Sequence, residues 1–174
     1  MGIIAKAGPT FVPAPEGQFP AVCADVVDLG MVTTEWNGSK RTAHKIRIVF
    51  LISEQTDDGR PFTVSQLFTL SLSEKANLRK FLESWRGRAF TAAELTDGFD
   101  IEKLLGADAL VQIVHAQKGD KVYANIATIM KAMKGMDKVT IPSDYVRAKD
   151  RTEEHKSFDQ IKQEVEDEDA DLPF

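Results

Sequence analysis

The residues of this sequence that could carry chemistry are cations placed close to aromatic rings. Two short segments combine the two types: Trp36, Lys40 and Arg41 in the first, and Lys118, Lys121 and Tyr123 in the second. A single strand of nucleic acid needs both types, because cations contact its phosphates while flat rings stack on its unpaired bases, at about 1–3 kcal/mol per base. These two segments are therefore candidates for one binding surface.

Two strand-like segments add further candidates. Lys45 and Arg47 alternate with isoleucines, so they share the strand face that points away from the apolar residues, together with Trp36. An ordinary solvated face explains Lys45 and Arg47 equally well. Trp36 can instead pack on the wall of a β-barrel, if the strands form one, or at a dimer contact. Phe68 lies in a later strand, and the sequence leaves open whether its face points inward or toward a ligand.

The sequence offers little for catalysis. Its three histidines lie in separate segments without ligand spacing, and it has no glycine-rich phosphate loop or nucleophile elbow. Asp25 and Asp28 lie within a strand segment, where structural or solvated roles are favoured over a Mg²⁺ site. Cys23 is the sole cysteine, which excludes an internal disulfide, and its apolar surroundings predict a buried, inert thiol. We expect no enzyme activity, no metal and no cofactor.

The elements that must position these residues begin with a hairpin. Residues 19–36 and 39–53 read as strands, and Asn37-Gly38 between them is a strong signal for a two-residue type I′ turn. That turn predicts three cross-strand pairs: Glu35 with Lys40, Leu29 with Ile46, and Val27 with Ile48. The same register turns Asp25 toward the core, so we expect a bulge or bend in the first strand.

The remaining elements predict a barrel closed by a helix. A turn at residues 57–59 leads into a third strand, and Ser71 with Glu74 forms a capping-box pattern before a helix whose apolar positions are Leu78, Phe81, Leu82 and Trp85. Gly87 can end that helix, and short helical turns are expected at 91–94 and 100–106. Two strands around residues 118–121 follow. The order β-β-β-α-β-β is that of a mainly β, five-stranded OB-fold barrel, which binds single strands between its two hairpins.

Charge divides the chain into a near-neutral body and an acidic end. Residues 151–174 hold three basic and nine acidic side chains of the chain's 22 and 27, which leaves 19 basic and 18 acidic in residues 1–150. We predict an extended arm at 1–18, a DNA-binding domain at 19–148 and a disordered acidic tail at 149–174. No apolar run is long enough for a membrane span and no signal segment is recognisable, so a cytoplasmic location is expected.

The last residues carry a resemblance to a known family. The ending "DEDADLPF" resembles the tip of bacterial single-stranded DNA-binding proteins, with Leu172 where those usually have isoleucine. The stretches "HKIRIVFLI", "NLRKFLESWRGRAFTAAEL", "IEKLLGADALVQIVH" and "YANIATI" resemble phage-encoded single-stranded DNA-binding proteins. The resemblance implies that Phe174 and Pro173 fill an apolar pocket on replication and repair partners, while Asp169 and Asp171 pair with its basic rim.

The sequence and the resemblance together predict a protein that binds single-stranded DNA without strong sequence preference. It would act in phage replication, recombination or repair, in the host cytoplasm, and recruit partners through its tail, with a homo-oligomer possible. Two alternatives stay open: a non-enzymatic adaptor or DNA mimic that binds basic surfaces through its acidic tail, and a protein that anneals complementary strands.

Overall fold

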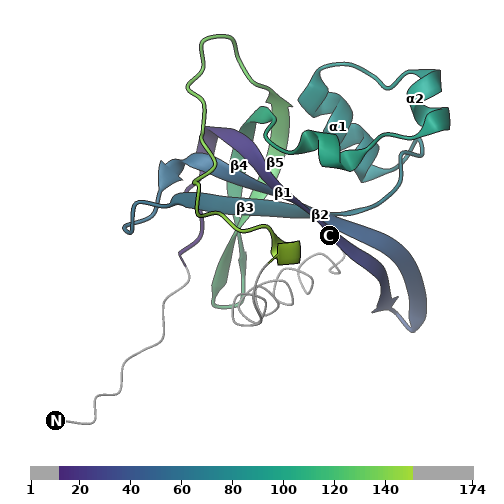
Figure 1. The fold of residues 1–174 in the computed structure, drawn as a ribbon. Helices are drawn as coiled ribbons and strands as arrows, with labels where there is room; N and C mark the ends of the chain where they lie inside the picture. Colours follow the sequence, from purple (N-terminus) through teal and green to yellow (C-terminus); the bar gives the residue numbers. More distant parts are fainter. Residues whose placement is uncertain (1–11, 151–174) are drawn as a thin grey trace.

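The computed structural model describes residues 12–150, which form a mainly β protein with two short helices (Figure 1). Five strands provide the framework: β1 (Gly17–Trp36), β2 (Ser39–Gln55), β3 (Pro61–Thr69), β4 (Asp108–Lys118) and β5 (Lys121–Lys131). Between β3 and β4 lie α1 (Asn77–Arg86), α2 (Ala92–Asp97) and the 3₁₀ helix η1 (Ile101–Leu104), and a second 3₁₀ helix, η2, covers Ala148–Asp150. The expected element order is confirmed.

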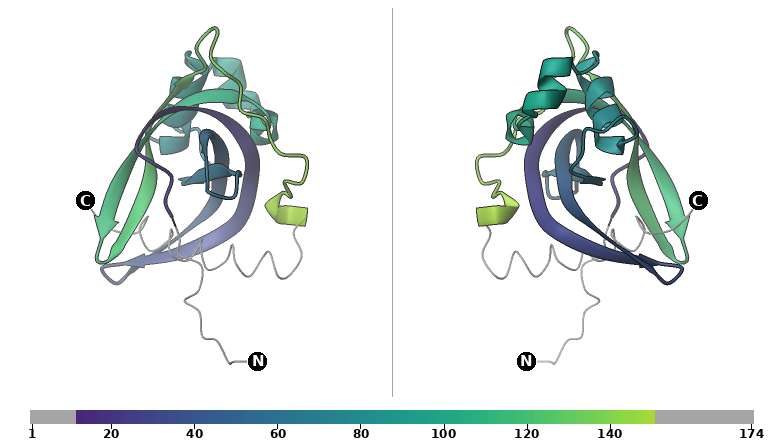
Figure 2. Two further views of the ribbon diagram at one scale, coloured as in Figure 1. Left: turned by 90° about the vertical axis from the view of Figure 1, so that its left-hand side faces the viewer. Right: turned by 90° about the vertical axis from the view of Figure 1, so that its right-hand side faces the viewer.

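The strands form one antiparallel sheet in the order β3-β2-β1-β4-β5. Figure 2 shows that this sheet curls strongly, so that its two edge strands approach each other. Cα atoms of β3 and β5 come within 8 Å of each other, but the two strands are not paired through hydrogen bonds. The sheet is therefore curved without being closed.

The first hairpin confirms the predicted turn and corrects the predicted register. Asn37 and Gly38 have φ angles of 48° and 78°, and Glu35 pairs with Lys40 as expected. An irregularity in β1 between Asp28 and Gly30 then shifts the pairing by one residue, and a second irregularity follows between Cys23 and Asp25. The other two predicted pairs are wrong as a result, because the cross-strand partners are Asp28 with Ile46, Val26 with Ile48, and Val27 with Arg47.

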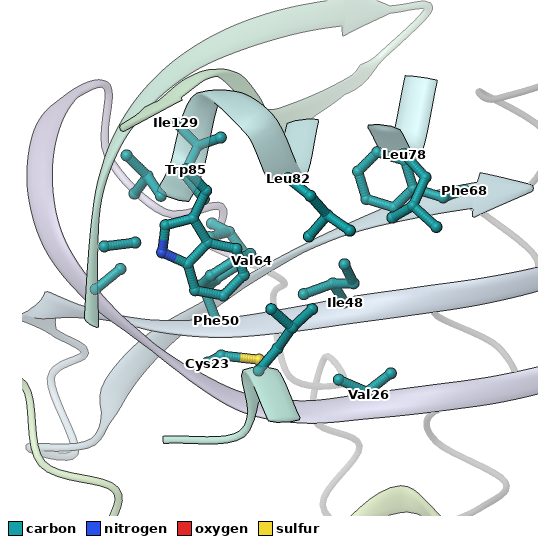
Figure 3. Close-up of a cluster of buried hydrophobic side chains, with 14 of the residues drawn as sticks. Cys23, Val26, Ile48, Phe50, Val64, Phe68, Leu78, Leu82, Trp85 and Ile129 are labelled. Carbon is teal, nitrogen blue, oxygen red and sulfur yellow. The ribbon is translucent and has the colours of Figure 1, made fainter. Parts of the chain in front are cut away.

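Helix α1 covers one end of the curved sheet and completes the core (Figure 3). Its residues Leu78, Leu82 and Trp85 are buried, and the Trp85 ring lies 5.1 Å from that of Phe50 in β2. The indole Nε1 of Trp85 donates to the carbonyl oxygen of Asp108 at 2.9 Å, which joins α1 to the start of β4. The predicted apolar face of this helix is confirmed.

The start of α1 differs from the prediction. The helix begins at Asn77 after Ala76, which makes no side-chain cap, and the Ser71 hydroxyl instead accepts from the Ser73 amide at 3.2 Å. The predicted capping box at Ser71 and Glu74 is therefore wrong. Local hydrogen bonding by serine competes with helix formation, and the residue that precedes the helix is Ala76 rather than Ser71. Gly87, with φ of 73°, ends the helix as predicted.

The segment after β5 returns across the outer face of the sheet. Its residues Val139, Ile141 and Tyr145 pack on a small apolar cluster of Val22, Ala24 and Leu51, so residues far along the chain cover β1 and β2 (Figure 1). Cys23 faces the opposite, inner side with no exposed surface, and burial raises its pKa to about 12. The predicted burial of this thiol is confirmed.

One buried ion pair fastens this returning segment. Asp25 is 1% exposed, and its carboxylate accepts from the Arg147 guanidinium at 2.9 Å and from the Ala148 amide at 2.7 Å. Arg147 also donates to the carbonyl oxygen of Val26 at 3.2 Å. The bulge expected near Asp25 is confirmed, and this acid has a structural role in pairing with Arg147.

We predict that Arg147→Leu lowers the free energy of unfolding by about 3–5 kcal/mol, because it leaves the buried Asp25 carboxylate unpaired. Urea unfolding measures the change. The matched control is Arg60→Leu, which breaks the exposed pair with Asp144 and should cost less than about 1 kcal/mol. Equal small losses in the two variants would contradict the assigned role of Arg147.

Candidate nucleic-acid interface

A groove of about 650 Å³ lies between the outer half of the β1–β2 hairpin and the connection from β3 to α1. It exists because β3 ends at Thr69, opposite Lys45, whereas β1 and β2 continue to Trp36 and Ser39. The outer half of the hairpin therefore extends beyond β3. The groove is lined by Leu29, Val32, Thr33, Thr34, Lys45, Leu67, Phe68, Thr69, Ser71, Ser73, Lys75, Ala76 and Asn77.

The lining combines cations with hydroxyl groups. Lys45 and Lys75 are its charged residues, and no carboxylate is among the described residues that line it. The Lys45 ammonium donates to the Thr69 hydroxyl at 2.9 Å, so a neutral group holds it at the groove wall. Threonine, serine and asparagine side chains supply both donors and acceptors. This surface suits a chain of negative charges with polar groups between them.

The start of α1 forms one end of the groove. Ala76 and Asn77 belong to the lining, and the first turn of the helix carries no acidic residue. The amino end of a helix bears a partial positive charge, which here is not offset by a carboxylate of its own first turn. It therefore adds to the positive potential from Lys75.

The second bulge in β1 shapes the opposite wall. The Asp28 carboxylate accepts from the Gly30 amide at 2.8 Å and contacts the His44 ring nitrogen Nε2 at 2.6 Å. Gly30 has φ of 69°, a conformation that favours glycine. Leu29 lies between these two anchored residues and lines the groove. The hydrogen bond from His44 holds the pKa of the Asp28 carboxyl below its usual value of 3.8.

The structure brings only one of the predicted cations into the groove. Lys45 lines it, while Lys40 and Arg41 are exposed farther out on the same hairpin. Lys40 lies opposite Glu35 and Arg41 opposite Thr34. Trp36 is the last residue of β1 and pairs with Ser39, but its side chain lies outside the described part of the structure, so its role in stacking stays a prediction.

Two predicted contact residues are buried, which corrects the sequence interpretation. Phe68 is 3% exposed, and its ring lies 4.7 Å from that of Phe81, so its face points into the core. Arg47 is 8% exposed between cross-strand neighbours Val27 and Leu67. The ring of Phe68 is therefore unavailable to a base, and Arg47 does not present an exposed charge to a phosphate.

The second hairpin does not contribute to the groove. Lys118 pairs with Lys121 at the end of the β4–β5 hairpin, and Tyr123 is half-buried opposite Ala116. None of these three residues is in the lining. A site framed by both hairpins therefore stays a prediction, and the second wall of this groove is the β3–α1 connection.

Sequence reasoning missed most of the lining. Thr69, Ser71, Ser73, Lys75 and Asn77 come from one short run, and a hydroxyl-rich segment with a lysine before a helix is the signal that could have marked it. Within residues 12–150, no three histidine, cysteine or acidic side chains lie close enough together to hold a metal ion.

Comparisons with known proteins do not identify the chain. No protein-family model matches it, and no curated protein matches it either. Among the described helices, none has the length and apolar character needed to cross a membrane.

We predict that His44→Ala raises the pKa of the Asp28 carboxyl toward 3.8, because the hydrogen bond from the ring is the main cause of its lowering. A carboxyl whose folded pKa is lowered stabilises the fold above its unfolded pKa, and this contribution is lost as the pH falls through the folded value. NMR titration of the Asp28 carboxyl carbon measures this pKa. His115→Ala is the control, since that ring contacts the Ala14 carbonyl instead. An unchanged Asp28 pKa in His44→Ala would refute the assignment.

Proposed function

We propose that this protein binds single-stranded DNA in the groove beside the β1–β2 hairpin, without strong sequence preference. The observation that carries the proposal is a groove whose charged residues are two lysines and whose described lining contains no carboxylate. Duplex DNA is a wide, stiff rod, whereas a single strand can bend into a curved groove and offer its bases to side chains.

The arrangement of the strands supports the same proposal. We propose that the curled five-stranded sheet is an open OB-fold, in which β3-β2-β1-β4-β5 is the strand order and helical segments separate β3 from β4. The groove lies beside β2 and β3, the strands across which OB-folds bind single strands. In this proposal the first hairpin contributes to the binding site, and the second hairpin does not line this groove.

The charge balance explains why the site must be local. Residues 1–150 hold 19 basic and 18 acidic side chains, so the body has no general attraction for a polyanion. Affinity then depends on where cations lie without carboxylates beside them, and on stacking. Lys45 and Lys75 are the cations of the groove, and its described lining contains no carboxylate. We propose that Trp36, at the end of the hairpin, supplies the stacking.

We further propose that the C-terminal residues recruit replication and repair proteins. Asp169, Asp171, Leu172, Pro173 and Phe174 lie outside the described residues, and the proposal rests on their resemblance to the tip of bacterial single-stranded DNA-binding proteins. One aromatic anchor beside several carboxylates suits an apolar pocket with a basic rim, because the ring supplies affinity and the charges supply steering.

We predict that oligo-dT binds much more tightly than duplex DNA of equal length, with log affinity falling by about 0.7 per log unit of salt for each phosphate neutralised. Lys45→Ala and Lys75→Ala should each lower that slope by about 0.7. Lys103→Ala, an exposed lysine of η1 outside the groove, is the matched control. Salt-titrated fluorescence anisotropy measures all four proteins.

Two results would count against this site. Equal affinity for single strands and duplex would indicate a general DNA-binding protein, and a slope unchanged by both groove substitutions would place the strand elsewhere. Including an RNA oligomer of the same length in the assay tests the preference for DNA over RNA.

We predict that deleting Asp169–Phe174 leaves oligo-dT binding as tight or tighter but abolishes capture of partner proteins. Removing carboxylates cannot weaken binding of a polyanion through charge, while the aromatic anchor is lost. Pull-down with replication and repair proteins of the host, alongside anisotropy, measures both effects. Partner capture that survives the deletion would refute the role of the tail.

A further inference from the structure

The exposed side of α1 continues from one end of the groove. Ala76 and Asn77 belong to the groove lining, and the Lys80 amide donates to the Ala76 carbonyl oxygen at 3.3 Å. Lys80 therefore lies one helical turn beyond the lining, and Ser84 lies one turn beyond Lys80. Residues three or four apart share one side of a helix, so Asn77, Lys80 and Ser84 form a line that leads away from the groove.

This line of residues meets the end of β5. The Ser84 hydroxyl donates to the carbonyl oxygen of Ile129, which lies two residues before Lys131, the last residue of β5. Lys131 pairs with the core residue Ala109, and opposite residues of paired strands point to the same face of the sheet. Lys131 thus belongs to the face of β5 that α1 covers. We call Lys80, Ser84 and Lys131 the α1 flank.

The charges of the α1 flank are positive. Lys80 and Lys131 are exposed, and neither makes an ion pair within residues 12–150. Glu83 is the one acidic residue of α1, and its charge is already engaged. Its carboxylate lies 3.4 Å from the Arg79 guanidinium and accepts from the Phe90 amide at 3.0 Å. The two lysines of the flank are therefore available to an anionic ligand.

The α1 flank has the same chemistry as the groove lining. Both combine lysines with hydroxyl groups, and neither includes a carboxylate among the described residues. From Ala76 to Ser84, at a rise of 1.5 Å per residue, the helix extends this surface about 12 Å beyond the groove. One lysine on a helix is an ordinary solvated side chain. Here, however, two lysines lie on a continuous path from a site of the same charge.

We propose that a single strand bound in the groove continues along the α1 flank, where Lys80 and then Lys131 contact its next phosphates. This inference rests on the proposed DNA binding in the groove, and it adds the direction in which the strand leaves. The strand passes over α1 toward the end of β5, away from the turn that joins β4 to β5. The binding site is then longer than the groove, so the contribution of the flank depends on the length of the strand.

Salt-titrated anisotropy with oligo-dT of about 4 and about 16 nucleotides, the range of OB-fold site sizes, tests this path. With the longer oligomer, Lys80→Ala and Lys131→Ala should each lower the slope of log affinity against log salt by about 0.7, because each loses one phosphate contact. With the shorter oligomer, which need not reach beyond the groove, both variants should keep the wild-type slope. Lys103→Ala, on η1 outside both surfaces, is the matched control and should keep both slopes.

The outcomes separate this path from the groove itself. Slopes that Lys45→Ala and Lys75→Ala lower, but that neither flank substitution changes, would overturn the path and leave the groove as the site. Equal lowering for the two lengths would also overturn it, because that pattern indicates a general effect of charge rather than contact. Absence of binding to both oligomers would overturn the path together with the groove. Should an alanine variant fail to fold, Lys80→Gln or Lys131→Gln removes the same charge and keeps most of the side chain.

Discussion

The structure depends on the length of one strand and on the unequal lengths of its partners. β1 has 20 residues and pairs with β2 to its end, but with β4 only from Gly17 to Val22, while β3 ends opposite Lys45. The far half of the β1–β2 hairpin is therefore left without neighbours in the sheet. The β3–α1 connection passes beside this free half, and the groove is the space between them.

The two bulges in β1 make this arrangement possible. A bulge bends its strand and strengthens the local twist, which lets a single sheet curl around the core. The first brings Asp25 to the Arg147 guanidinium, and the second is held by Asp28 and places Leu29 in the groove wall. Each bulge thus has a carboxylate that fixes it, and each carboxylate has a cation or a histidine as partner.

Local features of the fold could be predicted from the sequence. The Asn37-Gly38 turn, the buried face of α1 and the end of that helix at Gly87 all follow from short-range geometry. Register far from the turn could not be predicted, because a bulge shifts every later pair and its position depends on the curvature of the whole sheet. Arg147 and Asp25 are 122 positions apart, so their pairing has no local signal.

In the candidate site, too, local features could be predicted from the sequence and long-range features could not. Alternation placed Lys45 correctly on an outward face, but alternation alone could not say that Arg47, two residues on, is buried, nor that the face of Phe68 is the inner one. The groove brings together residues near 30, 45 and 70 of the sequence. Its second wall could not be predicted, because only folding places the β3–α1 connection beside the hairpin. Its hydroxyl groups carry no motif that distinguishes them from any polar loop.

The most direct test is to map where a single strand contacts the protein. Hydrogen exchange with and without oligo-dT reports backbone protection along the whole chain. Contact in the groove predicts slower exchange in residues 29–34 and 69–77, which form its two walls. Protection confined to the β4–β5 hairpin, with both groove walls unaffected, would contradict the proposed site.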